Sequence, residues 1–252
     1  MKRVDDFFSL KNTVGSVNEE ETKQTALYLE AVKAFSRTSY KSIYVVDYLK
    51  KGFEYVSENP LFLCGYTAKE VEEMGYDFYI KSLPEEDLEL LLALNTAGFD
   101  FYDKIPLEER KKYSISYDFH LRNKEGKTFL INQKLTPIFL TEDGKIWKAI
   151  CIVSLSTAEK AGNIQIYKQG SKKIYKYNIE KDYWKEEETL QLTTREKEIL
   201  HYSARGYTVN DIAEAIFVSP NTVKFHRKKL FDKLEVTSIG EAISYATHNK
   251  LI

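Results

Sequence analysis

Short runs of alternating hydrophobic and polar residues dominate the chain from residue 42 to residue 158. SIYVVD and FEYVS, separated by LKKG, predict two strands joined as a hairpin. Short pieces with helical spacing follow, ending in PEEDLELLLALNTAG. SISYDFHLRN then alternates strictly, and turns at 124–126 and 142–144 lead into two further strands. The order predicts an α+β domain in which one face of a five-stranded antiparallel sheet covers short helices.

The segments on either side of this domain have simpler patterns. Residues 18–37 place apolar side chains at helical spacing behind a run of acids, which predicts a helix. Both a packing helix at the domain edge and a dimerising helix fit this pattern. Residues 159–188 are expected to be a connector, in which IQIYK and KKIYKYN flank QGS as a β-hairpin.

The last 64 residues predict an all-α domain of four helices. Thr193 with Glu196, and Thr208 with Asp211, have the spacing of capping boxes. Ser219 precedes a proline, the favoured first residue of a helix, and Ser238 opens the fourth helix. Only Val218 and Ser219 separate the second and third helices, which is the spacing of a helix-turn-helix motif.

Composition and charge limit the possible functions. The whole chain has a net charge of −1, so any site for nucleic acid must be local. The third C-terminal helix, residues 220–234, supplies such a site because it holds five cations and one acid. The two cysteines lack metal or disulfide spacing, which favours a reducing compartment. No apolar run could span a membrane, and a cytoplasmic protein without membrane partners is expected.

Residues 55–74 (YVSENPLFLCGYTAKEVEEM) carry the first resemblance to a known family. Together with LPEEDLELL at 83–91 and the RNKEGK and TEDGKI hairpins, they resemble a PAS sensor domain. The resemblance covers about 115 residues and implies a domain that senses a small molecule or mediates dimerisation. The hydrophobic pattern places six side chains as candidates for a ligand pocket, with a filled core as the alternative: Tyr44, Tyr55, Phe62, Tyr117, Phe119 and Ile152.

The C-terminal segment carries a second resemblance. LTTREKEIL, GYTVNDIA, VSPNTVKFHRKKLFDKL and the EA that follows occur at the spacing of the LuxR-type helix-turn-helix family. The resemblance covers residues 190 to about 250. It implies binding to double-stranded DNA, with RNA polymerase as a further candidate partner.

A helical wheel assigns roles to the side chains of the third helix without the family. With 100° per residue, Val223, Leu230 and Leu234 lie on one side, which predicts their burial. The opposite side is expected to contact base edges through Asn221, Lys224, Phe225 and Lys228. Phosphate contacts are expected from Thr208, Ser219, Thr222, His226, Arg227 and Lys229. A solvated basic helix is the alternative.

Other chemistry has little support in the sequence. The four histidines lack metal-ligand spacing, and no catalytic motif occurs, so neither a metal site nor catalytic residues are expected. His120 lies on a polar strand face and Cys64 lacks a flavin-adduct setting, so haem and flavin are not expected. Cys64 is expected to be a small buried hydrophobe.

The predicted organisation has four parts: an N-terminal helical segment (1–40), a PAS-like sensor domain (41–158), a connector (159–188) and a LuxR-type DNA-binding domain (189–252). The predicted function is a sequence-specific transcription regulator, expected to be a homodimer because two recognition helices must reach two half-sites. The alternative is that the PAS-like part is a protein-interaction module, with regulation through a partner and no ligand.

Overall fold

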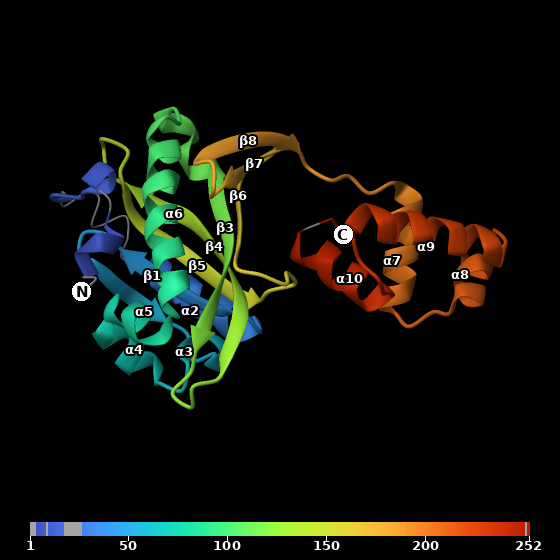
Figure 1. The fold of residues 1–252 in the computed structure, drawn as a ribbon, viewed down its shortest axis with the longest axis horizontal. Coiled ribbons are helices and arrows are strands. Elements are labelled where there is room, and N and C mark those ends of the chain that lie inside the picture. The colour runs from blue at the N-terminus through green and yellow to red at the C-terminus, as the bar shows by residue number, and fades with distance from the viewer. Residues whose placement is uncertain (1–3, 9, 18–26, 250) are drawn as a thin grey trace. The chain divides into compact units, whose positions relative to one another are not determined.

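The computed structural model describes residues 4–8, 10–17, 27–249 and 251–252. The chain divides into two compact units, Met1–Glu188 and Thr189–Ile252. The first unit is α+β and the second is all helical (Figure 1). No helix in the described residues is both long and apolar enough to cross a membrane.

The first unit contains short helices and eight strands. In chain order its elements are η1 (Val4–Phe7), η2 (Leu10–Asn12), α2 (Tyr28–Thr38), β1 (Ser42–Asp47), β2 (Gly52–Val56), α3 (Pro60–Leu63), α4 (Ala68–Met74), α5 (Asp77–Ser82), α6 (Glu85–Asp103), η3 (Leu107–Lys112), β3 (Tyr113–Arg122), β4 (Thr128–Leu140), β5 (Ile146–Leu155), β6 (Gly162–Lys168), β7 (Lys173–Asn178) and β8 (Tyr183–Glu188). The second unit holds α7 (Thr194–Ala204), α8 (Val209–Ala215), α9 (Pro220–Leu234) and α10 (Ile239–His248).

The strands form one antiparallel sheet in the order β2-β1-β5-β4-β3-β6-β7-β8. The five strands predicted from the sequence are β1 to β5, and they occupy adjacent positions in the sheet, as β2-β1-β5-β4-β3. All six residues of β1 are buried, because the strand lies between two neighbours and is covered on both faces. The predicted α+β arrangement, with an antiparallel sheet and short helices, is confirmed.

The sheet is larger than the five strands that the sequence predicts. Residues 159–188, expected as a connector, form β6, β7 and β8 and extend the sheet from β3. Ile164 and Ile166 on β6 are buried, so this segment adds to the core. The hairpin predicted around QGS is present as β6 and β7.

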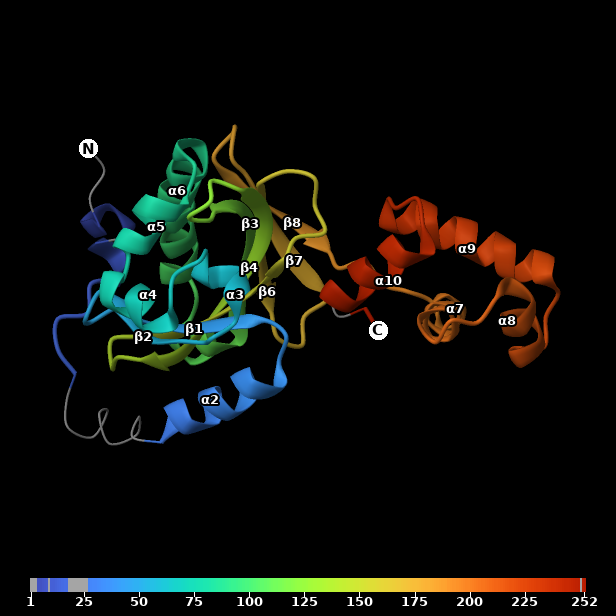
Figure 2. The same ribbon diagram turned by 90° about the horizontal axis from the view of Figure 1, so that it is seen from below.

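Helices lie on both faces of the sheet. Figure 2 shows α3, α4, α5 and α6 on one side and α2 on the other. The hydroxyl groups of Ser36 on α2 and Tyr55 on β2 are 2.6 Å apart, which ties α2 to its face. The predicted N-terminal helix covered residues 18–37, and its first part lies outside the described residues.

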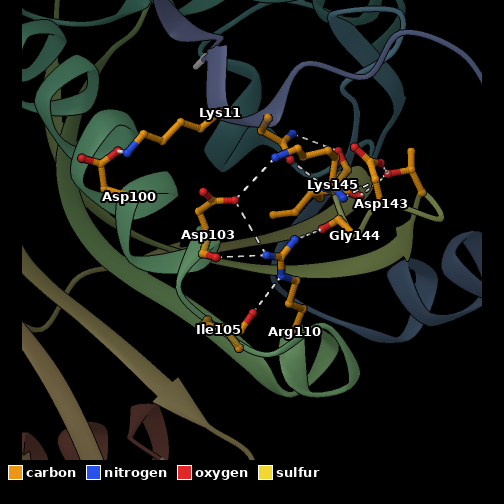
Figure 3. Close-up of polar contacts among 11 residues, drawn as sticks. Lys11, Asp100, Asp103, Ile105, Arg110, Asp143, Gly144 and Lys145 are labelled. Atoms are coloured by element: carbon orange, nitrogen blue, oxygen red, sulfur yellow. Dashed lines mark hydrogen bonds and ion pairs between the residues drawn. The ribbon is translucent and has the colours of Figure 1, made fainter.

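Arg110 ties the region after α6 to the β4–β5 hairpin (Figure 3). The buried guanidinium donates to three backbone carbonyl oxygens, those of Ile105 (3.0 Å), Gly144 (2.7 Å) and Asp103 (3.1 Å). Lys145 of the hairpin adds an ion pair to the carboxylate of Asp103 at 3.4 Å. A charge that is buried among acceptors in this way fixes the geometry of all three segments.

The four helices of the second unit begin where the sequence predicts. Thr193 and Thr208 form capping boxes, and the hydroxyls of Ser219 and Ser238 accept backbone N–H groups of α9 and α10. The carboxylate of Glu196 accepts a hydrogen bond from Lys233 on α9 at 2.7 Å. This ion pair joins the first turn of α7 to the last turn of α9.

We predict that Gly144→Ala is more destabilising than Gly126→Ala. Both glycines have positive φ, +76° and +82°, so both substitutions strain the backbone, at about 1–2 kcal/mol. A Cβ at Gly144 would lie 2.1 Å from Leu107 Cδ1 and 2.6 Å from Arg110 Nη1, whereas a Cβ at Gly126 meets nothing within 4 Å. Urea unfolding should give losses of about 2–4 kcal/mol for Gly144→Ala. Equal losses for the two variants would contradict the crowding at Arg110.

A second prediction concerns Glu196. Burial alone raises the pKa of its carboxyl, but hydrogen bonds from Lys233 and the Thr193 N–H outweigh burial and lower the pKa. A lowered folded-state pKa stabilises the fold above the ordinary glutamate pKa, and this stabilisation is lost as pH falls through the folded value. Glu196→Gln should therefore cost about 1–2 kcal/mol at neutral pH and little in acid.

The control for this prediction is Glu198→Gln on the same helix. In the part of the chain that the structure describes, the one ion pair of Glu198 is with the half-exposed Arg195, so its loss should change the free energy of unfolding by less than about 0.5 kcal/mol. Urea titrations of both variants at neutral and acidic pH make the comparison. An acid-insensitive loss for Glu196→Gln would show that its charge is not responsible.

Candidate DNA-binding surface and internal cavities

The start of α9 is fixed by a cap and a tight turn. The Ser219 hydroxyl accepts the backbone N–H of Thr222 at 3.1 Å, and Pro220 occupies the first helical position. The preceding turn is closed by a hydrogen bond of 2.9 Å from the Val218 N–H to the Ala213 carbonyl. This turn sets the direction in which α9 leaves α8, as in a helix-turn-helix motif.

The side of α9 that the wheel predicts to be buried is buried. Val223 and Leu230 are fully inaccessible and Leu234 is nearly so. Val223 packs with residues of α7 and α8, whereas Leu230 and Leu234 pack with residues of α7 and α10. The helix is therefore held to the rest of the domain along its whole length.

The opposite side of α9 is free of the domain. The four residues predicted to read bases are all exposed: Asn221, Lys224, Phe225 and Lys228. Within the described part of the chain, neither Lys224 nor Lys228 makes an ion pair with an acid. Lys229 Nζ lies 4.5 Å from the centre of the Phe225 ring. Lys224 and Lys228 can therefore bind a ligand without first breaking an ion pair within the domain.

The residues predicted to hold phosphate fall into two groups. Thr208 and Ser219 are exposed and cap α8 and α9, where a helix end has spare N–H groups and favours anions. Thr222, His226 and Arg227 are half-buried at the flanks of α9, and Lys229 is exposed. The Arg227 guanidinium lies 5.7 Å from the Phe231 ring centre, which directs it along the flank.

Two cavities lie against the inner face of the sheet in the first unit. The larger has a volume of about 70 Å³ and lies between α6 and strands β3 to β6. Its lining includes Leu94, Gly98, Tyr102 and Tyr117. The hydroxyl of Tyr102 is buried and has no hydrogen-bond partner in the described residues. The smaller, of about 20 Å³, shares Tyr48, Asn95, Tyr117 and Leu135 with the larger.

The smaller cavity is lined by a hydrogen-bonded network of neutral groups. Tyr44 donates to Gln133 Oε1 at 2.7 Å, and the Gln133 amide donates to the Tyr117 hydroxyl. The Tyr79 hydroxyl contacts both Tyr44 and Gln133. Burial raises the pKa of all three tyrosines well above the ordinary value, and that of the Cys151 thiol to about 12. Among the described residues, no charged side chain lines either cavity.

The six predicted pocket residues divide into three pairs. Tyr44 and Tyr117 line the smaller cavity. Phe62 and Phe119 are core residues, and Phe62 stacks on Tyr44 with ring centres 4.3 Å apart.

Tyr55 and Ile152 line neither of these two cavities. Tyr55 pairs with Val45 and Ile152 with Ile43, and alternation puts these residues on the α2 face, opposite Tyr44. The sequence reasoning also missed Tyr48, Tyr76, Tyr79, Asn95, Gln133 and Cys151. Gln133 gave a usable signal, because it is a polar residue between Ile131 and Leu135 on the buried face of β4.

The other residues weighed from the sequence have structural partners. His120 Nδ1 lies 2.8 Å from the buried carboxylate of Asp87 in the first turn of α6, which also accepts the His120 backbone N–H. Cys64 is buried, and burial raises its pKa to about 12. Its side chain packs in the hydrophobic core.

Comparison with known proteins bears mainly on the second unit. Residues 190–246 match the family model described as bacterial regulatory proteins, luxR family. Over 62 residues the chain is 45% identical to a protein of Salmonella typhimurium described as a probable csgAB operon transcriptional regulatory protein. That match covers 25% of this chain and 29% of the relative, so the chain spans less than a third of the curated relatives that it matches.

Solved structures resemble the chain more weakly. A Vibrio cholerae VqmA dimer, described as a LuxR-type receptor, matches 88% of both chains at 19% identity and a TM-score of 0.34. A PAS domain from Colwellia psychrerythraea matches 52% of this chain and 97% of its own at 17% identity and a TM-score of 0.37. Such low TM-scores do not establish kinship. The family match is confined to residues 190–246, and it shows a luxR-type helix-turn-helix domain at the C-terminus of the chain.

Proposed function

We propose that this chain is a transcription regulator that binds double-stranded DNA through α9. The observation that carries the proposal is the division of α9 into a buried apolar side and an exposed side bearing Asn221, Lys224, Phe225 and Lys228. A helix that is anchored along one side and cationic on the other fits the major groove. The luxR-family match of the C-terminal domain supports the same conclusion.

The exposed side and the flanks of α9 have different roles in this proposal. Lys224 and Lys228, one turn apart, donate to guanine O6 and N7, while Asn221 contacts a neighbouring base and the Phe225 ring contacts a thymine methyl. Thr208, Ser219, Thr222, His226, Arg227 and Lys229 contact phosphates, which fixes the register of the helix.

The experiment compares alanine variants on specific and scrambled duplexes at one salt concentration. Lys224→Ala or Lys228→Ala should cost about 1–3 kcal/mol on the preferred site and reduce discrimination at one or two base pairs. Arg227→Ala should weaken both duplexes alike and reduce the slope of log K against log salt by about 1.

Two controls accompany these variants. Lys197→Ala removes an exposed lysine of α7 and should leave the ratio of specific to scrambled affinity unchanged. Val223→Ala opens the core and should lower stability before it lowers DNA affinity. If the Lys224 and Lys228 variants keep the wild-type ratio while Arg227→Ala loses it, the base-reading side is wrongly assigned.

We further propose that the first unit senses a small, neutral molecule. The support is the pair of adjoining cavities, whose lining has hydroxyl and amide groups but no charge. An ionic ligand would be buried there without a counter-charge, at a high cost. The Tyr102 hydroxyl, which has no hydrogen-bond partner among the described residues, offers a hydrogen bond to such a molecule.

We propose a homodimer with α2 in its interface. Leu27 beside the helix is 80% exposed and Phe35 on it is 53% exposed, although Ser36 holds the helix to the sheet. Two copies would also supply two α9 helices to half-sites about one helical turn apart. RNA polymerase is the proposed partner through which such a regulator acts on transcription.

Native mass spectrometry of the full chain tests the sensing and dimer proposals together. The expected spectrum is a dimer with a bound neutral molecule that is released on unfolding. Leu94→Trp should fill the larger cavity and abolish the added mass, while Lys197→Ala, far from the cavity in sequence, should retain it. An empty protein that co-purifies with another chain would favour the alternative of a protein-interaction module, and a monomer would contradict the dimer.

A further inference from the structure

A phenylalanine occupies a position at the end of α8 where the backbone favours glycine. Phe217 has a φ of +54°, in the left-handed region. Its N–H donates to the Glu214 carbonyl at 3.2 Å, and the next N–H, that of Val218, donates to Ala213 at 2.9 Å. This pair of hydrogen bonds is the Schellman motif, in which the left-handed residue is usually glycine because a Cβ is strained there.

The same domain contains the motif with the expected residue. At the end of α7, Gly206 donates to Ser203 at 2.9 Å and Tyr207 donates to Tyr202 at 3.1 Å. Gly206 has a φ of +86° and no side chain to strain. The two helix ends are closed by the same hydrogen bonds, so closing the turn does not require the phenyl ring of Phe217.

The ring of Phe217 is not packed against the domain, so packing does not offset the backbone strain. It is 95% exposed, the highest value among large hydrophobic residues of the second unit. Val218, and not Phe217, packs against the cluster of Ile199, Ile212 and Val223. The other non-glycine residues with positive φ in the described chain are polar or buried: Lys51, Cys64, Asn163, Asp182 and Glu235. Strain that persists without a structural return points to a functional role.

Phe217 lies close in the chain to the start of α9. It lies in the turn two residues before Ser219, the cap of α9, so it stands directly ahead of the helix end that enters the groove in helix-turn-helix docking. The helix that follows carries five cations and one acid, which attract the phosphate backbone to this side. Between the phosphates, the apolar surface of DNA at the groove rim is deoxyribose.

We infer that Phe217 is a DNA-contacting residue whose ring packs on deoxyribose at the rim of the groove. The inference rests on the proposed function and adds to it an apolar, uncharged contact outside α9. Its contribution to affinity does not release counterions, so it is independent of salt. A sugar contact is present in every sequence, so it strengthens binding to specific and scrambled duplexes alike.

The test compares Phe217→Gly with the wild-type full chain. The DNA probes are the duplex that the wild type enriches from a randomised pool and a scrambled duplex of the same length. Phe217→Gly should unfold at the same temperature as the wild type or higher, because glycine relieves the strain. Its affinity for both duplexes should fall about 5- to 30-fold, with the slope of log K against log salt unchanged. Phe217→Leu, which keeps an apolar side chain, should recover part of the affinity.

Arg227→Ala is the matched control, because loss of a phosphate contact lowers affinity and also lowers the salt slope by about 1. Wild-type DNA affinity in Phe217→Gly would overturn the inference. This holds even if transcription with purified RNA polymerase falls, because the ring would then contact a protein and not DNA. A lowered melting temperature in Phe217→Gly would also overturn it, since the ring would then be structural. If the wild type enriches no duplex at all, the proposed function fails and the inference fails with it.

Discussion

The burial of one side of α9 is the constraint on which the proposed DNA-binding surface depends. Val223 and Leu230 are completely inaccessible, and they belong to two separate hydrophobic clusters, each of which includes a residue of α7. Because two clusters hold the helix at two points, its rotation about its own axis is fixed. The exposed positions of Lys224 and Lys228 follow from that rotation. The ion pair between Lys233 and Glu196 fixes the far end of the same helix.

The first unit depends on a different constraint, because its core buries several tyrosine hydroxyls that have only neutral hydrogen-bond partners. Tyr44, Tyr79 and Tyr117 place their hydroxyls in the core, where an unpaired hydroxyl would be costly. Gln133 supplies both an acceptor and a donor to these hydroxyls, so one amide satisfies several rings. The network is neutral at any physiological pH because burial holds the tyrosine pKa values high. Such a network keeps its hydrogen bonds as pH changes and presents a polar but uncharged wall to the cavities.

Local patterns predicted the second unit well and the first unit less completely. The caps at Thr193, Thr208 and Ser219 and the buried stripe of α9 depend on residues within four positions of one another, so a sequence reveals them directly. The pocket depends on strand register, which joins residues far apart in the chain. The direction of Ile152 could not be predicted, because ICIV in β5 is apolar on both faces and alternation gives no sign of which face is inward. For Tyr55 the register with β1, which contains a bulge, decides the face.

Long-range pairing also explains why β6, β7 and β8 were not expected in the sheet. Their hairpins are local and predictable, but the pairing of β6 with β3 joins segments about 50 residues apart. That pairing matters for the connection between the two units. β8 ends at Glu188 and α7 begins at Thr194, so any signal that travels along the chain passes through residues 189–193. Two of these residues are already held by the second unit: Leu192 is buried in its core and the Gln191 carbonyl accepts from Lys233. Since Lys233 lies on α9, the chain contacts the helix proposed to bind DNA within a few residues of leaving β8.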